Sequence, residues 1–268
     1  MNLILVEARA YWILFAVAFL GTAVWESFRA KRSLSAPPER RWASHAVVLL
    51  ATSLVPALFR VSPVVLASML AGSRFGLLNR PGLPLLVRCV LAFLALDLTR
   101  YALHWISHSV TFLWRLHEVH HSDPDFDVST GVRHHPFEVV FTQGAYLGAV
   151  ALLAPPVVAV LVAELASTCQ SLVMHANASL PVWAEHLLRL VYITPDIHRI
   201  HHSAEIAEQS CNLGFILPWW DRIFGTYLAE PAAGQEKMIT GLRDVPQDRA
   251  FNPFFLFTAP FRRIHPPS

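Results

Sequence analysis

Three histidine-rich motifs hold most of the residues in this chain that could do chemistry. The first, H-x-x-x-H, is formed by His104 and His108. The other two share the spacing H-x-x-H-H, and their members are His117, His120, His121, His198, His201 and His202. Residues at i, i+3 and i+4 lie on one face of a helix, so each motif can offer two or three imidazoles to one point. Imidazole is a good ligand for iron, zinc, copper and nickel, and we interpret the motifs as parts of a metal site.

Two further histidines extend the candidate ligands to ten. His175 ends a polar stripe at helical spacing, and His135 precedes Pro136. Tetrahedral zinc needs only four protein ligands, so ten imidazoles suit two metal ions of higher coordination number, with room for an exogenous ligand. His134 is expected to be structural or to support a ligand. The isolated histidines are expected to be surface residues or to have their hydrogen bonds satisfied, and these are His45, His186 and His265.

A charged stripe precedes the first motif. Asp97, Arg100, His104 and His108 are spaced by three, four and four residues, which keeps them on one side of a helix. Ionisable residues inside a membrane segment normally face the bundle interior and find partners there. We therefore expect Asp97 and Arg100 to pair with each other and to support His104, or to form a purely structural ion pair.

The segment "DPDFD" resembles the start of a calcium loop through Asp123, Asp125 and Asp127. An EF-hand loop requires glycine at its sixth position and glutamate at its twelfth, but Val128 and His134 stand there. We therefore predict a turn whose carboxylates cap helices.

The elements that must position these residues are predominantly apolar. Of the 268 residues, 54 % are hydrophobic and 15 % are charged, whereas soluble domains have roughly 25 % charged residues. Apolar regions cover residues 10–25, 46–70, 83–105 and 139–173. A membrane helix needs about 20 residues, so the last region suits two spans joined at Pro155 and Pro156. Residues 46–70, broken by Pro56 and Arg60, suggest a kinked span or a short hairpin.

These regions predict an all-α, polytopic membrane helical bundle with about four or five spans and a cytoplasmic histidine-rich cap. Glu7 and Arg9 make a poor basic region for a signal peptide, so the first apolar region is expected to be a retained span. We divide the chain into an N-terminal membrane region (1–82), a catalytic domain (83–230) and a C-terminal tail (231–268). The net charge of +2 is too small to indicate nucleic-acid binding.

Basic residues in the short loops indicate the orientation. The loop after the first span holds five of them: Arg29, Lys31, Arg32, Arg40 and Arg41. The loop before the third span offers only Arg74 and Arg80. By the excess of basic residues in cytoplasmic loops, the first loop is cytoplasmic. The clustered histidines then all reach the cytoplasmic face, and the predominance of arginine over lysine points to a bacterial inner membrane.

The order of the motifs, followed by "CNLGFILPWWDRIFGTY", resembles the fatty acid hydroxylase and sterol desaturase superfamily over residues 90–230. The segments "TPDIHRIHH" and "WDRIFGTY" are similar to the alkylglycerol monooxygenase branch and its bacterial relatives. The segment "RHHPFE" is similar to the sterol-oxidising branch. The resemblance implies a membrane-bound, non-haem di-iron oxygenase in which the three motifs and His175 bind two iron ions.

The resemblance also implies a lipid substrate, such as a fatty acyl chain, a sterol or an ether lipid, that is hydroxylated or desaturated with O2. Asn212 and Gly214 match the family's Asn-Tyr-Gly, with Leu213 in place of tyrosine. Asp221 matches the family's W-D-x-x-F-G-T stretch, and the resemblance implies that it orients a ligating imidazole. The sequence shows no flavin or nicotinamide fingerprint, so electrons are expected from an external ferredoxin- or cytochrome-like donor.

Two other functions fit parts of this pattern. A zinc-dependent membrane hydrolase would use a metal-bound water and needs a glutamate base, for which Glu118 is the obvious candidate. A metal transporter would place histidines and acids along a path at mid-membrane, whereas here they gather at the ends of the apolar regions.

Overall fold

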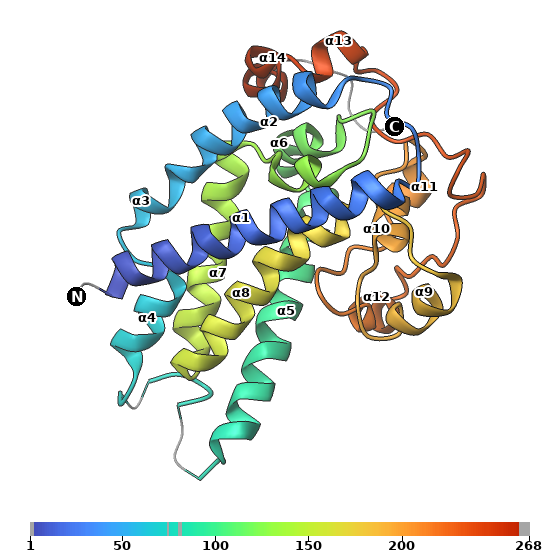
Figure 1. Cartoon of the computed structure of the whole chain (residues 1–268). Helices are drawn as coiled ribbons and strands as arrows, with labels where there is room; N and C mark the ends of the chain where they lie inside the picture. Colours follow the sequence, from blue (N-terminus) through green and yellow to red (C-terminus); the bar gives the residue numbers. More distant parts are fainter. Residues whose placement is uncertain (1–2, 74, 80–81, 263–268) are drawn as a thin grey trace.

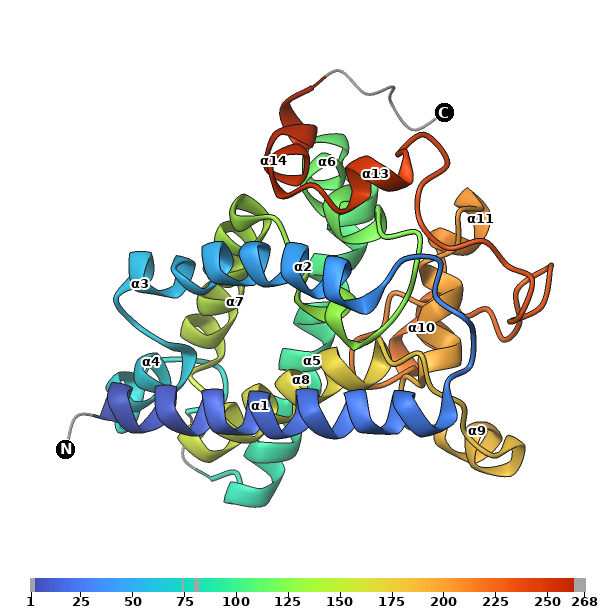
Figure 2. The ribbon, with the colours of Figure 1, turned by 45° about the horizontal axis from the view of Figure 1, so that its top comes forward.

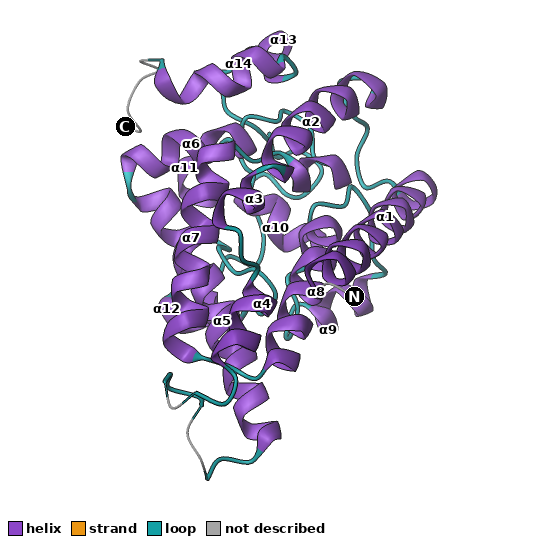
Figure 3. Cartoon of the chain, turned by 90° about the vertical axis from the view of Figure 1, so that its left-hand side faces the viewer, coloured by secondary structure: helices purple, strands orange, loops and turns teal. Residues whose placement is uncertain are grey.

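A computed structural model describes residues 3–73, 75–79 and 82–262, so Arg74, Arg80 and His265 lie outside the described residues. The described part is helical and contains no strand, only two isolated bridges (Figure 3). Its first half contains α1 (Leu3–Arg29), α2 (Pro38–Ser53), α3 (Val55–Phe59), α4 (Pro63–Leu70), α5 (Leu85–Ser109), α6 (Thr111–His121), η1 (Val128–Val132), α7 (Pro136–Leu153) and α8 (Val157–Met174). Short elements follow: α9 (Val182–Leu188), α10 (Pro195–His201), α11 (Ile206–Gln209), α12 (Trp219–Phe224), α13 (Gln247–Ala250), α14 (Pro253–Thr258) and η2 (Ala259–Phe261).

Three of the described helices are long and apolar enough to cross a membrane. They are the Ala8–Arg29 part of α1, α7 and α8. The predicted turn between the last two is confirmed, since Ala154 has a left-handed backbone (φ 42°) and ends α7 just before the two prolines. Helix α5 is 25 residues long, but it contains Arg88, Asp97 and Arg100 and is not one of the three.

The second apolar region is divided into three short helices. Arg60 follows α3 with a left-handed backbone (φ 55°), and the hydroxyl of Ser62 then accepts a hydrogen bond from Val65 N to begin α4. None of α2, α3 and α4 is among the three candidate spans. The break predicted at Pro56 and Arg60 is therefore present, and it interrupts the region more than once.

A core between α4, α5, α7 and α8 aligns the helices that carry the histidines. It consists of Val64, Ala67, Leu96, Tyr146, Val150, Val160 and Ala163. His104 and His108 lie in the last turns of α5, His175 caps the end of α8, and His135 precedes α7. The packed helices thus bring these residues to one end of the bundle, where α6 and α10 also lie (Figure 1).

Helix α1 runs along the outside of the bundle (Figures 1 and 2). Only 6 % of the residues in its 18-residue apolar stretch are buried, and the side chains of Ile13, Val17 and Leu20 are more than 60 % exposed. An apolar surface of this kind suits hydrocarbon rather than water. At its C-terminal end, the carboxylate of Glu26 accepts hydrogen bonds from the backbone N–H groups of Val128 (2.7 Å) and Asn177 (2.6 Å). These hydrogen bonds join α1 to the start of η1 and to the segment that follows His175.

Candidate metal centre

Nine histidines form two adjoining clusters at this end of the bundle. Cluster A consists of His104, His108, His117, His121 and His201, and cluster B consists of His120, His175, His198 and His202. Within each cluster, one nitrogen from every ring lies within 4.8 Å of the others. The rings of His121 and His202 stack across the boundary with centroids 4.5 Å apart. The structure therefore offers two neighbouring metal positions.

Each H-x-x-H-H motif is divided between the two clusters. On α6, His117 and His121 belong to cluster A, while His120 belongs to cluster B. The third motif does the reverse, with His198 and His202 in cluster B and His201 in cluster A. Each motif thus offers two imidazoles to one cluster, within the two or three expected, and its remaining imidazole belongs to the other cluster. At 100° per residue, positions i and i+4 are 40° apart, whereas i+3 points 60° to the other side of i.

The distances between nitrogens fit a shared cation. In cluster A, His117 Nε2 lies 3.2 Å from both His104 Nε2 and His121 Nε2. In cluster B, His175 Nε2 lies 3.1 Å from His120 Nε2 and 3.0 Å from His198 Nε2. Two nitrogens bound to one metal at about 2.0–2.1 Å are about 2.9 Å apart at a right angle and about 3.4 Å apart at the tetrahedral angle.

Four of the rings are oriented by an acceptor at Nδ1. His104 donates to Leu213 O (2.9 Å), His201 to Cys211 O (2.9 Å) and His175 to Ser171 O (2.6 Å). His117 Nδ1 lies 2.7 Å from the carboxylate of Glu138. Hydrogen-bonded Nδ1–H groups of this kind leave Nε2 as a lone pair facing the cluster, which is the usual arrangement of metal-ligating histidine.

Lone pairs that face one another at about 3 Å repel each other unless a cation lies between them. In addition, the buried Nε2 atoms of His108, His201 and His202 have no hydrogen-bond partner among the described residues. Buried polar atoms are rarely left in this state. These donors fit two resident metal ions.

Burial keeps these imidazoles neutral, which is the form that binds metal. Desolvation lowers the pKa of His175 to about 3. For His120, His121, His198 and His202, desolvation and the neighbouring imidazoles hold the pKa well below the ordinary 6.5. Cluster B is fully buried, whereas His104 and His108 of cluster A are only partly buried. Cluster A is therefore the open side of the site, where a further ligand has access.

The loop 211–214 supports the clusters through its backbone. Asp221 accepts hydrogen bonds from Leu213 N (2.8 Å) and Gly214 N (2.9 Å), and Leu213 O in turn accepts from His104. Asp221, which was expected to orient a ligating imidazole, is thus linked to His104 through the peptide backbone. A Cβ at Gly214 would lie 2.6 Å from Asp221 Oδ2, so only glycine fits there.

Asn212 fixes the start of the same loop. Its backbone is left-handed (φ 55°), and its amide donates to Ile197 O (3.1 Å) and Leu228 O (2.9 Å) while its oxygen accepts from Leu228 N. It therefore ties the loop to α10, which carries the third motif.

Asp97 and Arg100 do not form the pair that the sequence suggested. Asp97 accepts hydrogen bonds from Ile216 N (3.1 Å), Leu217 N (3.2 Å) and Trp220 Nε1 (2.9 Å). Arg100 instead pairs with Glu164 of α8 at 2.6 Å. Asp97 therefore anchors the loop before α12, and Arg100 joins α5 to α8.

His135 lies outside both clusters, which corrects its assignment as a candidate ligand. Its Nδ1 accepts from Phe137 N (3.2 Å), capping α7, and its Nε2 lies 3.4 Å from Phe257 O. The preceding His134 stacks on His120, with centroids 4.5 Å apart, and its Nδ1 lies 3.2 Å from Glu138. Its expected role as a supporting residue agrees with this position.

Glu138 is the functional candidate that sequence reasoning missed. Together with His117 and His134 it forms a third group of potential metal-binding side chains. Its position three residues after His135, at the start of an apolar helix, looks like an ordinary helix N-terminal acid. The "RHHPFE" spacing was the one indication of a further role. Glu118 is in none of the three groups.

The three aspartates of "DPDFD" lie in a buried ionic network. Arg41 of α2 contacts Asp123 (2.7 Å) and Asp127 (2.5 Å), and Asp127 also caps η1 as predicted. His45 is buried with Nδ1 2.8 Å from the Ser129 hydroxyl, as expected of a satisfied histidine. The network fixes α2 against the loop that follows α6.

Several proteins of known function are similar to this chain over about 150 residues. Human alkylglycerol monooxygenase is 31 % identical over 158 residues, covering 56 % of this chain and 32 % of that enzyme. The zebrafish (Danio rerio) alkylglycerol monooxygenase is 32 % identical over 152 residues, covering 57 % and 32 %. An ornithine lipid hydroxylase of Rhizobium tropici is 29 % identical over 148 residues, covering 55 % and 44 %.

The chain thus spans about a third of the length of the alkylglycerol monooxygenases and less than half of the ornithine lipid hydroxylase. No solved structure matches it significantly. The fatty acid hydroxylase family model matches residues 89–226, which is more than half of the chain and contains both clusters. The chain therefore belongs to the fatty acid hydroxylase family.

Proposed function

We propose that this protein is a membrane-bound lipid hydroxylase whose two histidine clusters hold two iron ions. The observation that carries the proposal is the pair of adjoining clusters with mutually facing imidazole nitrogens 3.0–3.2 Å apart. The names of the relatives support hydroxylation over desaturation, because one is a monooxygenase of alkylglycerol and another hydroxylates ornithine lipid. A fatty acyl chain, a sterol or an ether lipid is the substrate class.

When bound, iron supplies the activation of O2 that attack on an unactivated C–H bond requires. The chain would contribute the geometry around it. Leu213 O, Cys211 O, Ser171 O and Glu138 fix four imidazoles by their Nδ1 atoms. The fully buried cluster B excludes water, and the partly buried side of cluster A leaves access for reactants.

The remaining parts of the proposal concern partners and location. A ferredoxin- or cytochrome-like protein would deliver the electrons from outside the chain. The bundle would lie in a bacterial inner membrane with both clusters on the cytoplasmic side, which agrees with the basic residues at the end of α1, in the α1–α2 connection and at the start of α2. The two clusters adjoin each other, so a single orientation serves both.

The test compares the lipids of a host that expresses the wild type with those of one that expresses His120→Ala, under air, ¹⁸O2 and nitrogen. We expect a lipid that gains one ¹⁸O atom only under oxygen and only with the wild type. His186→Ala, at an exposed position outside the clusters, is the matched control and should behave as the wild type. The proposal would be overturned if the wild type produced no oxygen-dependent lipid change, or if His120→Ala produced the same change.

The same preparations test the zinc hydrolase. That enzyme would contain stoichiometric zinc and would act equally well under nitrogen. The position of Glu118, outside the three groups of metal-binding side chains, counts against it as the base of such an enzyme.

A further inference from the structure

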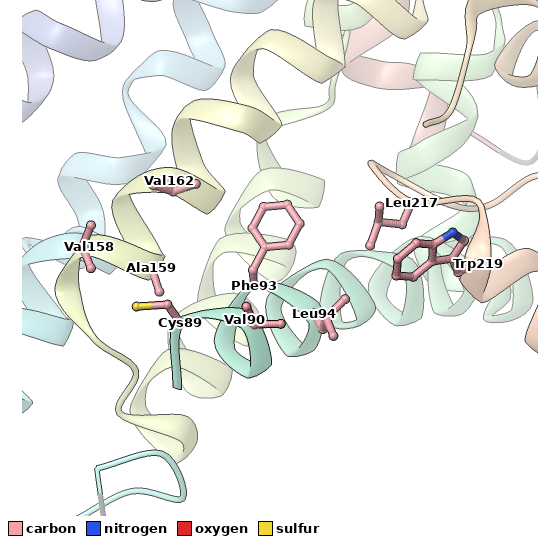
Figure 4. A pocket seen from close by; sticks show the side chains of 9 residues that line it. All are labelled: Cys89, Val90, Phe93, Leu94, Val158, Ala159, Val162, Leu217 and Trp219. Carbon is pink, nitrogen blue, oxygen red and sulfur yellow. The ribbon is translucent and has the colours of Figure 1, made fainter. Parts of the chain in front are cut away.

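An apolar groove lies between α5 and α8, and none of its lining residues belongs to the histidine clusters (Figure 4). Its volume is about 320 Å³, at the lower end of the range of small-molecule sites. It is lined by Cys89, Val90, Phe93, Leu94, Val158, Ala159, Val162, Leu217 and Trp219. The indole Nε1 of Trp219 donates to Leu190 O at 2.9 Å, so this wall of the groove has no free hydrogen-bond donor.

Water is a poor occupant of this groove. An ordered water needs two to four polar partners, and the lining side chains offer only the thiol of Cys89. An empty groove is also unfavourable, because its walls lose the dispersion contacts that close packing gives them. The groove therefore calls for an apolar occupant.

The surroundings of the groove identify hydrocarbon as that occupant. One wall belongs to α8, which is a candidate membrane span. Val90, Val158 and Val162 on its rim are each about half exposed, at 50, 50 and 51 %. Along α5 the exposed apolar surface continues to Leu86, which is 75 % exposed. The groove is thus continuous with the surface that the helices turn toward the bilayer.

The third wall links the groove to the metal centre. Leu217 and Trp219 belong to the segment that Asp97 anchors through Leu217 N. The same segment begins near Leu213, whose carbonyl orients His104. Along α5, Leu94 precedes His104 by ten residues, or about 15 Å. An occupant of the groove therefore contacts the segment that supports cluster A.

We propose that the groove binds one hydrocarbon chain of a bilayer lipid against the 213–219 segment. The binding site goes beyond the proposed hydroxylase activity and does not require it. It differs from general contact with lipid because the chain is held on three sides, by α5, α8 and Trp219.

Photolabelling tests this proposal. The protein is reconstituted into phosphatidylcholine nanodiscs that contain a phosphatidylcholine with a diazirine in one acyl chain, and labelled residues are mapped after irradiation. Since dispersion contacts add up over three walls, we expect at least about threefold more label at Phe93 and Leu94 than at Leu86. Val162→Trp, which fills the groove, should remove this excess. Leu161→Trp, on the same helix but outside the lining, should not.

Both substituted positions are exposed, so neither variant threatens the core. Equal labelling of the groove and of Leu86, or an excess that survives Val162→Trp, would overturn the proposal. An unlabelled groove in a protein that runs as a dimer would show that a second copy covers it, which also overturns the proposal. His120→Ala should label like the wild type, so a failed hydroxylase assay leaves this result unaffected.

Discussion

Glu138 Oε1 lies 2.7 Å from Nδ1 of His117, and the same oxygen lies 3.2 Å from Nδ1 of His134. One carboxylate therefore orients a member of cluster A and the ring that stacks on His120 of cluster B. It is the one acid in the described residues that is grouped with histidines as a potential metal-binding side chain. Removal of this carboxylate should therefore weaken metal binding at both positions.

The first prediction concerns this carboxylate. Glu138→Ala should lower the affinity for iron by about 10- to 100-fold, which is typical when a partner of a ligating histidine is lost. Glu138→Gln keeps an acceptor for His117 and should lose less. Competition with a chelator, followed by metal analysis, measures both variants.

Glu208→Ala is the matched control, since Glu208 is equally buried and accepts a hydrogen bond from Ala232 N away from the clusters. A similar loss of affinity in Glu208→Ala would mean that general destabilisation is responsible.

The second prediction separates ligands from the histidine that lies outside the clusters. His198→Ala leaves cluster B with three imidazoles, so iron should fall to about one ion per chain or below. His135→Asn should leave the iron content unchanged, because asparagine also caps a helix and His135 is in neither cluster. The number of iron ions per chain, measured in the two purified variants, tests this prediction. If His135→Asn lost as much iron as His198→Ala, the division into clusters A and B would be incorrect.

The third prediction is a pH dependence of the metal-free protein. The folded-state pKa of His175 is lowered to about 3, and burial lowers the pKa of His120, His121 and His202 in the same direction. The unfolded chain binds these protons near pH 6.5, whereas the folded chain does not. Between about pH 3 and pH 6.5 the unfolded state therefore binds more protons than the folded state. The free energy of unfolding of the metal-free protein accordingly decreases as the pH falls below 6.5.

We therefore expect the melting temperature of the metal-free protein to be lower at pH 5 than at pH 7.5. Iron should reduce the difference, since bound metal holds the imidazoles deprotonated. Thermal denaturation in detergent, with and without iron, measures it. A melting temperature that is the same at both pH values would contradict the burial of the neutral imidazoles.

The fourth prediction concerns the buried pair of Arg41 and Asp123, whose side chains are fully buried. Arg41→Met leaves Asp127 without its cation and Asp123 with only the more distant Arg133 (3.9 Å), and the loss of one partner of a buried pair costs about 3–5 kcal/mol. Arg40→Met changes the neighbouring exposed arginine and should cost less than about 0.5 kcal/mol. Denaturation of the two variants in parallel measures the difference. Equal stability of the two would show that the network contributes nothing.

The sequence predicted the features that depend on local spacing. The hairpin of α7 and α8 follows from the length of residues 139–173 and from Pro155 and Pro156, and the structure confirms it. The helical class is confirmed as well. Nine of the ten predicted ligands are brought together, because motif spacing on short helices limits where imidazoles can point.

The features that were missed depend on partners far apart in the chain. Arg100 was expected to pair with Asp97 three residues away, but its partner is Glu164, 64 residues away. Arg41 meets Asp123 across 82 residues. Periodicity shows which face of a helix a residue occupies, and it does not show which element packs against that face.

The fate of His135 illustrates the same limit. A histidine beside a proline at the start of a helix can be a ligand or a cap, and the choice depends on the direction of one side chain. Here the ring turns back to its own backbone at Phe137, while His134 turns toward Glu138. Two adjacent residues of the same type thus take different roles.

Both H-x-x-H-H motifs are divided between the clusters, so metal binding at one position should influence metal binding at the other. Helices α6 and α10 each contribute to both clusters, so an ion in either cluster immobilises both helices. The second ion then meets ligands whose ordering entropy has already been lost, which is a source of positive cooperativity. Iron should accordingly load in pairs, and half-filled protein should be scarce at every iron concentration.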